Sequence, residues 1–160
     1  MHLTKKASYG LIATFELARS AGSEPVSAGT IADRYGLPAP FVEKILHRLK
    51  QSGLIVSRQG RSGGYALADD PKRISVRRVL EALDESLDLV GCLGADACCE
   101  LTDICPTKPA WGMINRRFHA LLESLSLDDL RRNDAGEMKD ERGEASKRGK
   151  GVVKGDTART

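Results

Sequence analysis

The cysteines of this chain are gathered in one short segment, and no other part of the sequence contains any: Cys92, Cys98, Cys99 and Cys105. The chain opens with Met-His-Leu-Thr-Lys-Lys, and no apolar signal core follows these charges. We therefore expect a cytoplasmic protein without a membrane span, in which thiols stay reduced. Clustered reduced thiols favour a metal ion or a metal cluster over a disulfide framework.

Thiolates are the main ligands of iron–sulfur clusters, so such a cluster is one candidate for the cysteine segment. The cysteine spacing lacks the C-x2–4-C pairs of structural zinc sites and the tight C-x2-C-x2-C run of ferredoxin-like electron carriers. A zinc site and a metal-free thiol switch stay open as alternatives. The sequence shows no paired carboxylates, Ser-His-Asp set or phosphate-binding loop, so we do not expect an enzyme.

Charge is divided unevenly along the 160 residues, although the formal net charge is only +3. Residues 1–78 hold 13 Lys and Arg against 6 Asp and Glu, a net of +7. Residues 79–130 hold 3 against 10, a net of −7, and residues 131–160 hold 9 against 6. A basic first segment suits a polyanion such as DNA.

The pattern of residues 1–78 is typical of a winged helix-turn-helix DNA-binding domain. Helices are predicted over residues 5–20, 27–36 and 39–52, with Thr4 as the first N-cap and Gly53 as the last stop signal. Two short strands, 54–57 and 65–67, flank a glycine-rich connection that forms the wing.

Residues 79–130 combine a cysteine loop (88–106) with a long helix that starts near Pro109. Ser75 is predicted to cap a preceding helix. Apolar residues of the long helix are separated alternately by three and four positions: Trp111, Ile114, Phe118, Leu121 and Leu125. This heptad-like seam favours dimerisation, with packing against the chain's own domain as the alternative. Residues 131–160 contain no aromatic residue and half are charged, so we expect a disordered tail.

The third helix has an apolar face (Val42, Ile45, Leu46 and Leu49) opposite a polar one. Because an α-helix fits the major groove, we predict contacts to double-stranded DNA from the polar face and the start of the helix: Ala39, Pro40, Glu43, Lys44, His47 and Arg48. Glu43 can accept from cytosine N4 but otherwise repels phosphate, so it is a candidate for selectivity. Phosphate or minor-groove contacts are predicted from the first helix and the wing: Lys5, Tyr9, Arg58 and Arg61.

Several motifs together resemble the Rrf-type family of winged-helix transcription regulators: Leu3-Thr4-Lys5…Tyr9, Ile31-Ala32…Gly36, Val42-Glu43…Leu46…Leu49, Gly53-Leu54-Ile55, Arg58…Gly60…Gly63-Gly64-Tyr65 and Leu80-Glu81-Ala82…Asp84-Glu85-Ser86. The resemblance covers roughly residues 1–130. It implies a mainly α fold with a small β-wing, a homodimer joined through the long helix, and a near-palindromic operator. It also implies an iron–sulfur cluster on three cysteines, and a role for Glu43 in setting which promoters are recognised.

By this resemblance, Cys92 and Cys105 are the outer ligands of a [2Fe–2S] or [4Fe–4S] cluster. The middle ligand is Cys98 or Cys99, because one residue is inserted relative to the family spacing. We favour Cys99, since the loop before it can absorb the extra residue. Lys108 stands where some members have a ligating histidine, and protonated lysine cannot ligate. The fourth ligand is left open between the other middle cysteine, a small exogenous molecule and an oxygen ligand of the partner subunit.

The sequence thus predicts a dimeric DNA-binding transcription regulator that senses iron, redox state or nitric oxide through an iron–sulfur cluster. A small metal-containing redox or electron-transfer protein is the alternative from another class of function.

Overall fold

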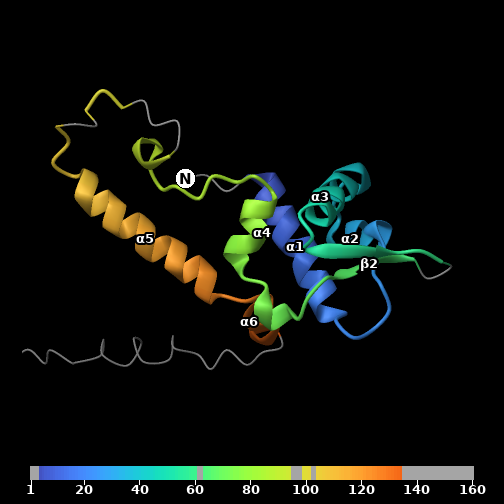
Figure 1. Cartoon of the computed structure of the whole chain (residues 1–160). Coiled ribbons are helices and arrows are strands. Elements are labelled where there is room, and N and C mark those ends of the chain that lie inside the picture. Colours follow the sequence, from blue (N-terminus) through green and yellow to red (C-terminus); the bar gives the residue numbers. More distant parts are fainter. Residues whose placement is uncertain (1–3, 61–62, 95–98, 102–103, 135–160) are drawn as a thin grey trace, which may run out of the picture.

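The computed structural model describes residues 4–60, 63–94, 99–101 and 104–134. A helical head carries a two-stranded wing on one side, and a long helix lies on its other side (Figure 1). The predicted class, mainly α with a small β-wing, is confirmed. Arg61, Cys98 and residues 135–160 lie outside the described residues, so the predicted disorder of the tail is not tested there.

Three helices of the head begin and end close to the positions that their capping residues predict: α1 (Lys5–Arg19), α2 (Ala28–Tyr35) and α3 (Ala39–Gln51). The Thr4 hydroxyl accepts a hydrogen bond from the backbone N–H of Ala7 at 3.1 Å. Ser27 does the same for Thr30 at 3.0 Å, so each cap satisfies an N–H that the helix leaves unpaired. Gly36, in the left-handed region at φ 61°, ends α2.

The wing is an antiparallel pair, β1 (Ile55–Arg58) and β2 (Gly64–Leu67), in which Ile55 pairs with Leu67 and Arg58 with Gly64. Val26 also bridges to Tyr65, which ties β2 to the loop between α1 and α2. A Cβ at position 64 would lie 2.7 Å from the backbone oxygen of Val26. Only glycine therefore permits this close approach, which fixes the wing to the head.

The hydrophobic core of the head extends beyond residue 78. Helix α4 (Val76–Ala82) follows a short 3-10 turn η1 (Pro71–Arg73) and contributes Val79 to the same buried cluster as α1 and α3. Leu83 and Leu127 belong to this cluster as well. The predicted boundary between the two segments thus crosses continuous packing, and the division stays a prediction about function.

The chain returns to the head after α5 (Lys108–Ser124), where it forms α6 (Leu127–Arg132). The backbone N–H of Val76 donates to Leu125 O at 2.8 Å, and that of Leu127 donates to Ile74 O at 2.9 Å. These two hydrogen bonds join the start of α4 to the end of α5.

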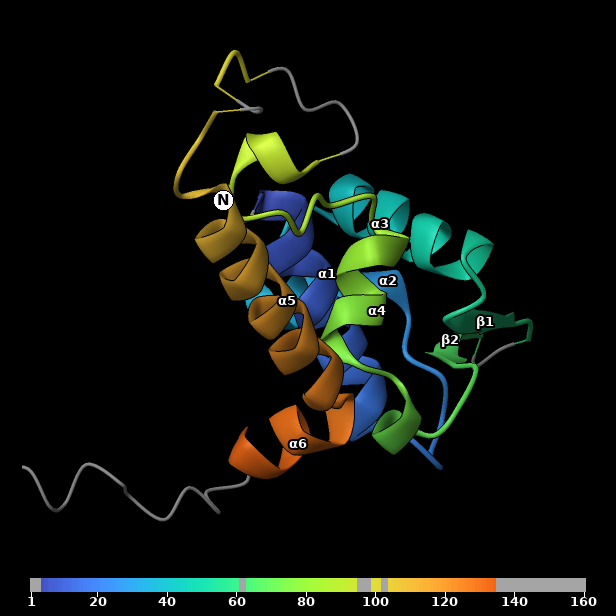
Figure 2. The ribbon, with the colours of Figure 1, turned by 60° about the vertical axis from the view of Figure 1, so that its left-hand side comes forward.

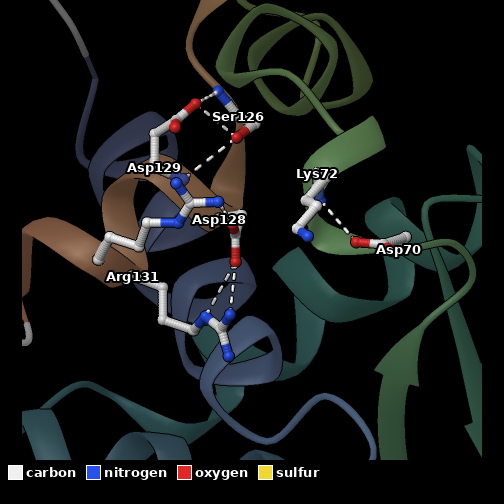
Figure 3. Close-up of polar contacts among 7 residues, drawn as sticks. Asp70, Lys72, Ser126, Asp128, Asp129 and Arg131 are labelled. Carbon is white, nitrogen blue, oxygen red and sulfur yellow. Dashed lines mark hydrogen bonds and ion pairs between the residues drawn. The ribbon is translucent and has the colours of Figure 1, made fainter.

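Charged side chains fix α6 at both ends (Figure 3). Ser126 and Asp129 form a reciprocal capping box, and the buried Asp128 carboxylate accepts from Arg131 at 2.5 Å and from Arg132 at 2.6 Å. The hydrogen bond from Arg131 lowers the pKa of Asp128. Both arginines are therefore helical, although they fall within the tail predicted to be disordered.

Helix α5 packs against α4 and buries none of its residues (Figure 2). The predicted seam is wrong at its last position, because Leu125 lies after the helix in an extended conformation and packs against the cluster around Val76 and Leu80. Other seam residues remain open to solvent, with exposed fractions of 39% for Trp111, 43% for Ile114 and 54% for Leu121. Among the described residues, no helix is long and apolar enough to cross a membrane.

Candidate nucleic-acid interface and cysteine segment

Helix α3 has two chemically distinct faces. Its apolar residues are buried in the core as predicted: Val42, Ile45, Leu46 and Leu49. The residues predicted to contact DNA are all exposed: Ala39, Pro40, Glu43, Lys44, His47 and Arg48. No bulky side chain precedes Phe41 on the first turn, so the helix start can approach a duplex closely. Contact with DNA itself stays a prediction.

The other predicted DNA contacts come from α1 and the wing. Lys5 is exposed in the first turn of α1, and Arg58 is exposed at the end of β1. Tyr9 is half-buried, and its ring packs edge-on against Phe41 with centroids 5.5 Å apart and an interplanar angle of 88°. This contact orients the start of α3 against α1. Arg61, the other wing arginine, lies outside the described residues.

Two carboxylates after α4 hold residues of the head, and sequence reasoning missed this role. Arg48 Nη2 donates to the Asp84 carboxylate, and both side chains remain largely exposed. The neighbouring Glu85 carboxylate, which is nearly buried, accepts from the Thr4 hydroxyl at 2.5 Å and lies 3.4 Å from Lys6 Nζ. The sequence shows only two adjacent acids, and no local pattern indicates partners 36 and 81 positions away.

The cysteine segment runs from the end of α4, through a 3-10 turn η2 (Gly91–Leu93), to α5. Cys92 and Cys105 are half-buried, Cys99 is exposed, and all three are free thiols. The Cys105 Sγ lies 3.3 Å from the Thr107 hydroxyl, and this hydrogen bond lowers the pKa of the thiol. A lowered thiol pKa favours the thiolate, which is the form that binds a metal.

The donor chemistry of the segment fits an iron–sulfur cluster, since three reduced thiols are available in one loop. Within the described part of the chain, no group of three or more His, Cys, Asp and Glu is close enough to hold a metal ion. Cys98 is outside that part, so the choice between Cys98 and Cys99 stays a prediction.

Asn115 on α5 clamps the chain that leads into the cysteine segment. Its side-chain oxygen accepts from the Leu89 N–H at 3.0 Å, and its nitrogen donates to Asp88 Oδ1 at 2.9 Å. His119, one turn later, lies 3.3 Å from the Leu87 carbonyl oxygen. The segment before Cys92 is therefore fixed to the helix that carries the exposed apolar seam. Asn115 was not a predicted site residue, because an isolated asparagine gives no sequence signal.

A three-helix core, a wing and an exposed polar row on the third helix define a winged-helix DNA-binding protein. The chain belongs to the Rrf2 family, whose model is described as an iron-dependent transcriptional regulator and matches residues 3–133. The predicted family is thus confirmed, and the chain is a transcriptional regulator of this family.

Named relatives agree with this membership. The regulator IscR of Xenorhabdus nematophila is 35% identical over 133 residues, which cover 83% of this chain and 80% of that protein. A putative regulator of Azotobacter vinelandii, ORF2, is 34% identical over 130 residues, 81% of this chain and 79% of that protein. These relatives are named as regulators of transcription and not as enzymes, as expected.

Solved structures of the same family share the fold. CymR, the global cysteine regulator of B. subtilis, superposes with a TM-score of 0.72 at 28% identity, over 83% of this chain and 98% of that chain. T. potens IscR gives a TM-score of 0.68 at 30% identity, over 89% and 95% of the two chains.

Proposed function

We propose that this regulator is a homodimer that binds a near-palindromic operator through α3 and responds to an iron–sulfur cluster held by its cysteine segment. The cluster makes the protein a sensor of iron, redox state or nitric oxide in the cytoplasm. The observation that carries the proposal is the two-faced α3: four buried aliphatic residues hold the helix, and its polar row faces outward.

The polar row has the chemistry that reads DNA. Lys44 and His47 can donate to guanine or to phosphate, and Glu43 can accept from cytosine N4. Lys5 on α1 and Arg58 on the wing would contact backbone phosphates on either side of the recognition helix. Such flanking contacts set the register of the protein on the duplex and leave sequence discrimination to α3.

The exposed stripe on α5 supports the dimer. Trp111, Ile114 and Leu121 are large apolar residues at helical spacing, and a monomer would leave all three in water. A second copy of the same helix would cover them by a self-complementary contact, as two-fold symmetry requires. The distance between the two α3 helices in the dimer would then set the spacing of the operator half-sites.

The cluster would be held by Cys92, Cys105 and one of Cys98 and Cys99, with the fourth ligand still open. The family description as iron-dependent and the hydrogen bond from Thr107 that lowers the pKa of the Cys105 thiol support this assignment. A bound cluster would supply a redox- and ligand-sensitive group in the cysteine segment, just after the residues that Asn115 binds. The alternatives to a cluster are a zinc site and a metal-free thiol switch in the same segment, and the cysteine replacements below distinguish them.

Replacing Lys44 should weaken duplex binding without affecting the fold. At about 100 mM salt, Lys44→Ala is expected to lose roughly three- to tenfold in affinity for a mixed-sequence duplex, and to make the slope of log K against log salt shallower by about one. Fluorescence anisotropy over a salt series measures both quantities. Arg116→Ala is the control, because it removes the same charge from the exposed surface of α5, away from α3 in Figures 1 and 2. Salt-independent binding of the wild-type chain would contradict the proposed function.

The four cysteines can be separated by single replacements. In anaerobically purified protein, Cys92→Ala and Cys105→Ala should each abolish visible absorption and lower iron and sulfide content, because each removes a ligand. Of Cys98→Ala and Cys99→Ala, only one should do so, and the other serves as its matched control. Full cluster content in both middle variants would show that the spacing argument is wrong. Colourless protein that contains zinc would show that the segment holds a zinc site and not a cluster.

A charge placed on the exposed stripe of α5 should separate the dimer. Leu121→Lys is expected to weaken self-association at least about tenfold, because an unpaired ammonium group would be buried in the interface. Sedimentation equilibrium on the full chain measures the effect. Ala120→Lys adds the same charge to an exposed position beside the stripe and should leave the dimer intact. A wild-type chain that is monomeric at high concentration would exclude this interface.

A further inference from the structure

Asp84 occupies an unusual backbone position at the end of α4. It is the one non-glycine residue with positive φ, 52°, among the residues that the structure describes. Its N–H donates to Glu81 O at 2.9 Å, and the N–H of Glu85 donates to Leu80 O at 3.1 Å. This is the hydrogen-bond pattern of a Schellman motif, in which glycine or asparagine usually takes the left-handed position. An aspartate there adds a negative charge that the turn itself does not need.

The charge of Asp84 is directed at the recognition helix. Its carboxylate accepts from Arg48 of α3, and the two side chains retain exposed fractions of 52% and 60%. An ion pair so open to water contributes little to folding stability, because solvent screens it and two long side chains must be ordered. The main physical effect of Asp84 is therefore to neutralise a cation that would otherwise face a polyanion.

The space around this pair allows Arg48 to move. A cavity of about 320 Å³ adjoins the pair, with the cations Lys6, Lys44 and Arg48 in its lining and Asp84 as its one carboxylate-bearing residue. A second cavity, of about 300 Å³, lies between α3 and the end of α4, and Arg48 and Asp84 line it as well. Because both cavities are lined by Arg48 and Asp84, the guanidinium can exchange partners without displacing core residues.

We propose that Asp84 is an intramolecular competitor of the DNA backbone phosphate for Arg48. The proposal rests on the proposed function, since it concerns the regulation of the same DNA-binding surface. When a duplex meets α3, a backbone phosphate takes the guanidinium of Arg48, whose N–H groups can bind two phosphate oxygens at once, and Asp84 is released to water. Until then Asp84 masks the cation and repels phosphate.

The consequence of the competition is selectivity. Arg48 bound to phosphate would strengthen binding to every duplex equally, so masking it lowers sequence-independent affinity. Contacts of α3 with base edges, such as those proposed for Glu43 and His47, then decide a larger share of the total binding free energy. Asp84 also lies only a few residues before the stretch that Asn115 clamps, which connects it to the segment that leads to Cys92.

The test measures binding of the full chain to a duplex of about 30 base pairs of mixed sequence, because the predicted effect is independent of sequence. Asp84→Asn keeps the size of the side chain and suits the left-handed turn. It should bind about three- to tenfold more tightly at about 100 mM salt, with a salt slope steeper by about one, the equivalent of one additional phosphate contact. Glu81→Gln makes the same charge change one turn earlier on α4, where the acid pairs with Arg77, and should bind like wild type.

A double-mutant cycle separates competition for Arg48 from a general change in charge. In an Arg48→Ala background, Asp84→Asn should give no gain in affinity. Asp84→Gly is a second variant that removes the same charge, and glycine suits the left-handed turn best. It should give the same gain in affinity as Asp84→Asn. Thermal unfolding of each variant confirms that folded chains are compared.

Three results would overturn the inference. In the first, Asp84→Asn and Glu81→Gln both bind with the affinity of wild type. In the second, Asp84→Asn keeps its gain in affinity in the Arg48→Ala background. In the third, the salt slope of Asp84→Asn equals that of wild type. Each of these leaves the proposed function intact, because wild-type binding is still observed. A wild-type chain that does not bind the duplex in a salt-dependent manner removes the proposed function, and the inference with it.

Discussion

The burial of four aliphatic side chains on one face of α3 determines what the rest of the head can do. Val42, Ile45, Leu46 and Leu49 each have an exposed fraction of 2% or less, and full burial of such a side chain stabilises by roughly 1.5–3 kcal/mol. A rotation of the helix by one position, about 100°, would expose these residues and bury charged ones. The packing therefore fixes which residues face outward, and a polar row for DNA follows from it.

The same core connects the DNA-facing surface to the cysteine segment. Helices α4 and α6 share the cluster that holds α3, and backbone hydrogen bonds join Val76 to Leu125 and Leu127 to Ile74. The cysteine segment links α4 to α5, and its start is held by two contacts: Asp84 pairs with Arg48 of α3, and Asp88 and Leu89 bind Asn115 of α5. These contacts give a change of shape in that segment a route to Arg48 of α3 and to α5, which carries the proposed dimer surface.

Local signals in the sequence were sufficient for most of the fold. Serine and threonine caps, Gly36 and the glycine-rich wing placed the helices and strands of the head within a residue or two, because each acts on its own neighbours. The sequence did not predict contacts between distant residues, such as those of Arg48 with Asp84 and of Asn115 with Leu89. It also placed Leu125 in the exposed seam, whereas Leu125 packs against the cluster around Val76 and Leu80. Arg131 and Arg132 also become helical through buried Asp128, which composition alone does not indicate. The family resemblance supplied the cluster, which cysteine spacing alone does not define, and it agreed with the dimer that the apolar seam of the long helix already favoured.

In the proposed sensor, the state of the cysteine segment changes how tightly α3 binds DNA. The most direct measurement compares the affinity of the anaerobic, cluster-containing dimer with that of the same dimer after cluster removal, on one operator duplex selected by the protein and at one salt concentration. A coupling of about 1–3 kcal/mol predicts that the two affinities differ by roughly 5- to 150-fold. Equal affinities of the two forms would contradict the account, because a cluster that does not distinguish the DNA-bound state cannot act as its sensor.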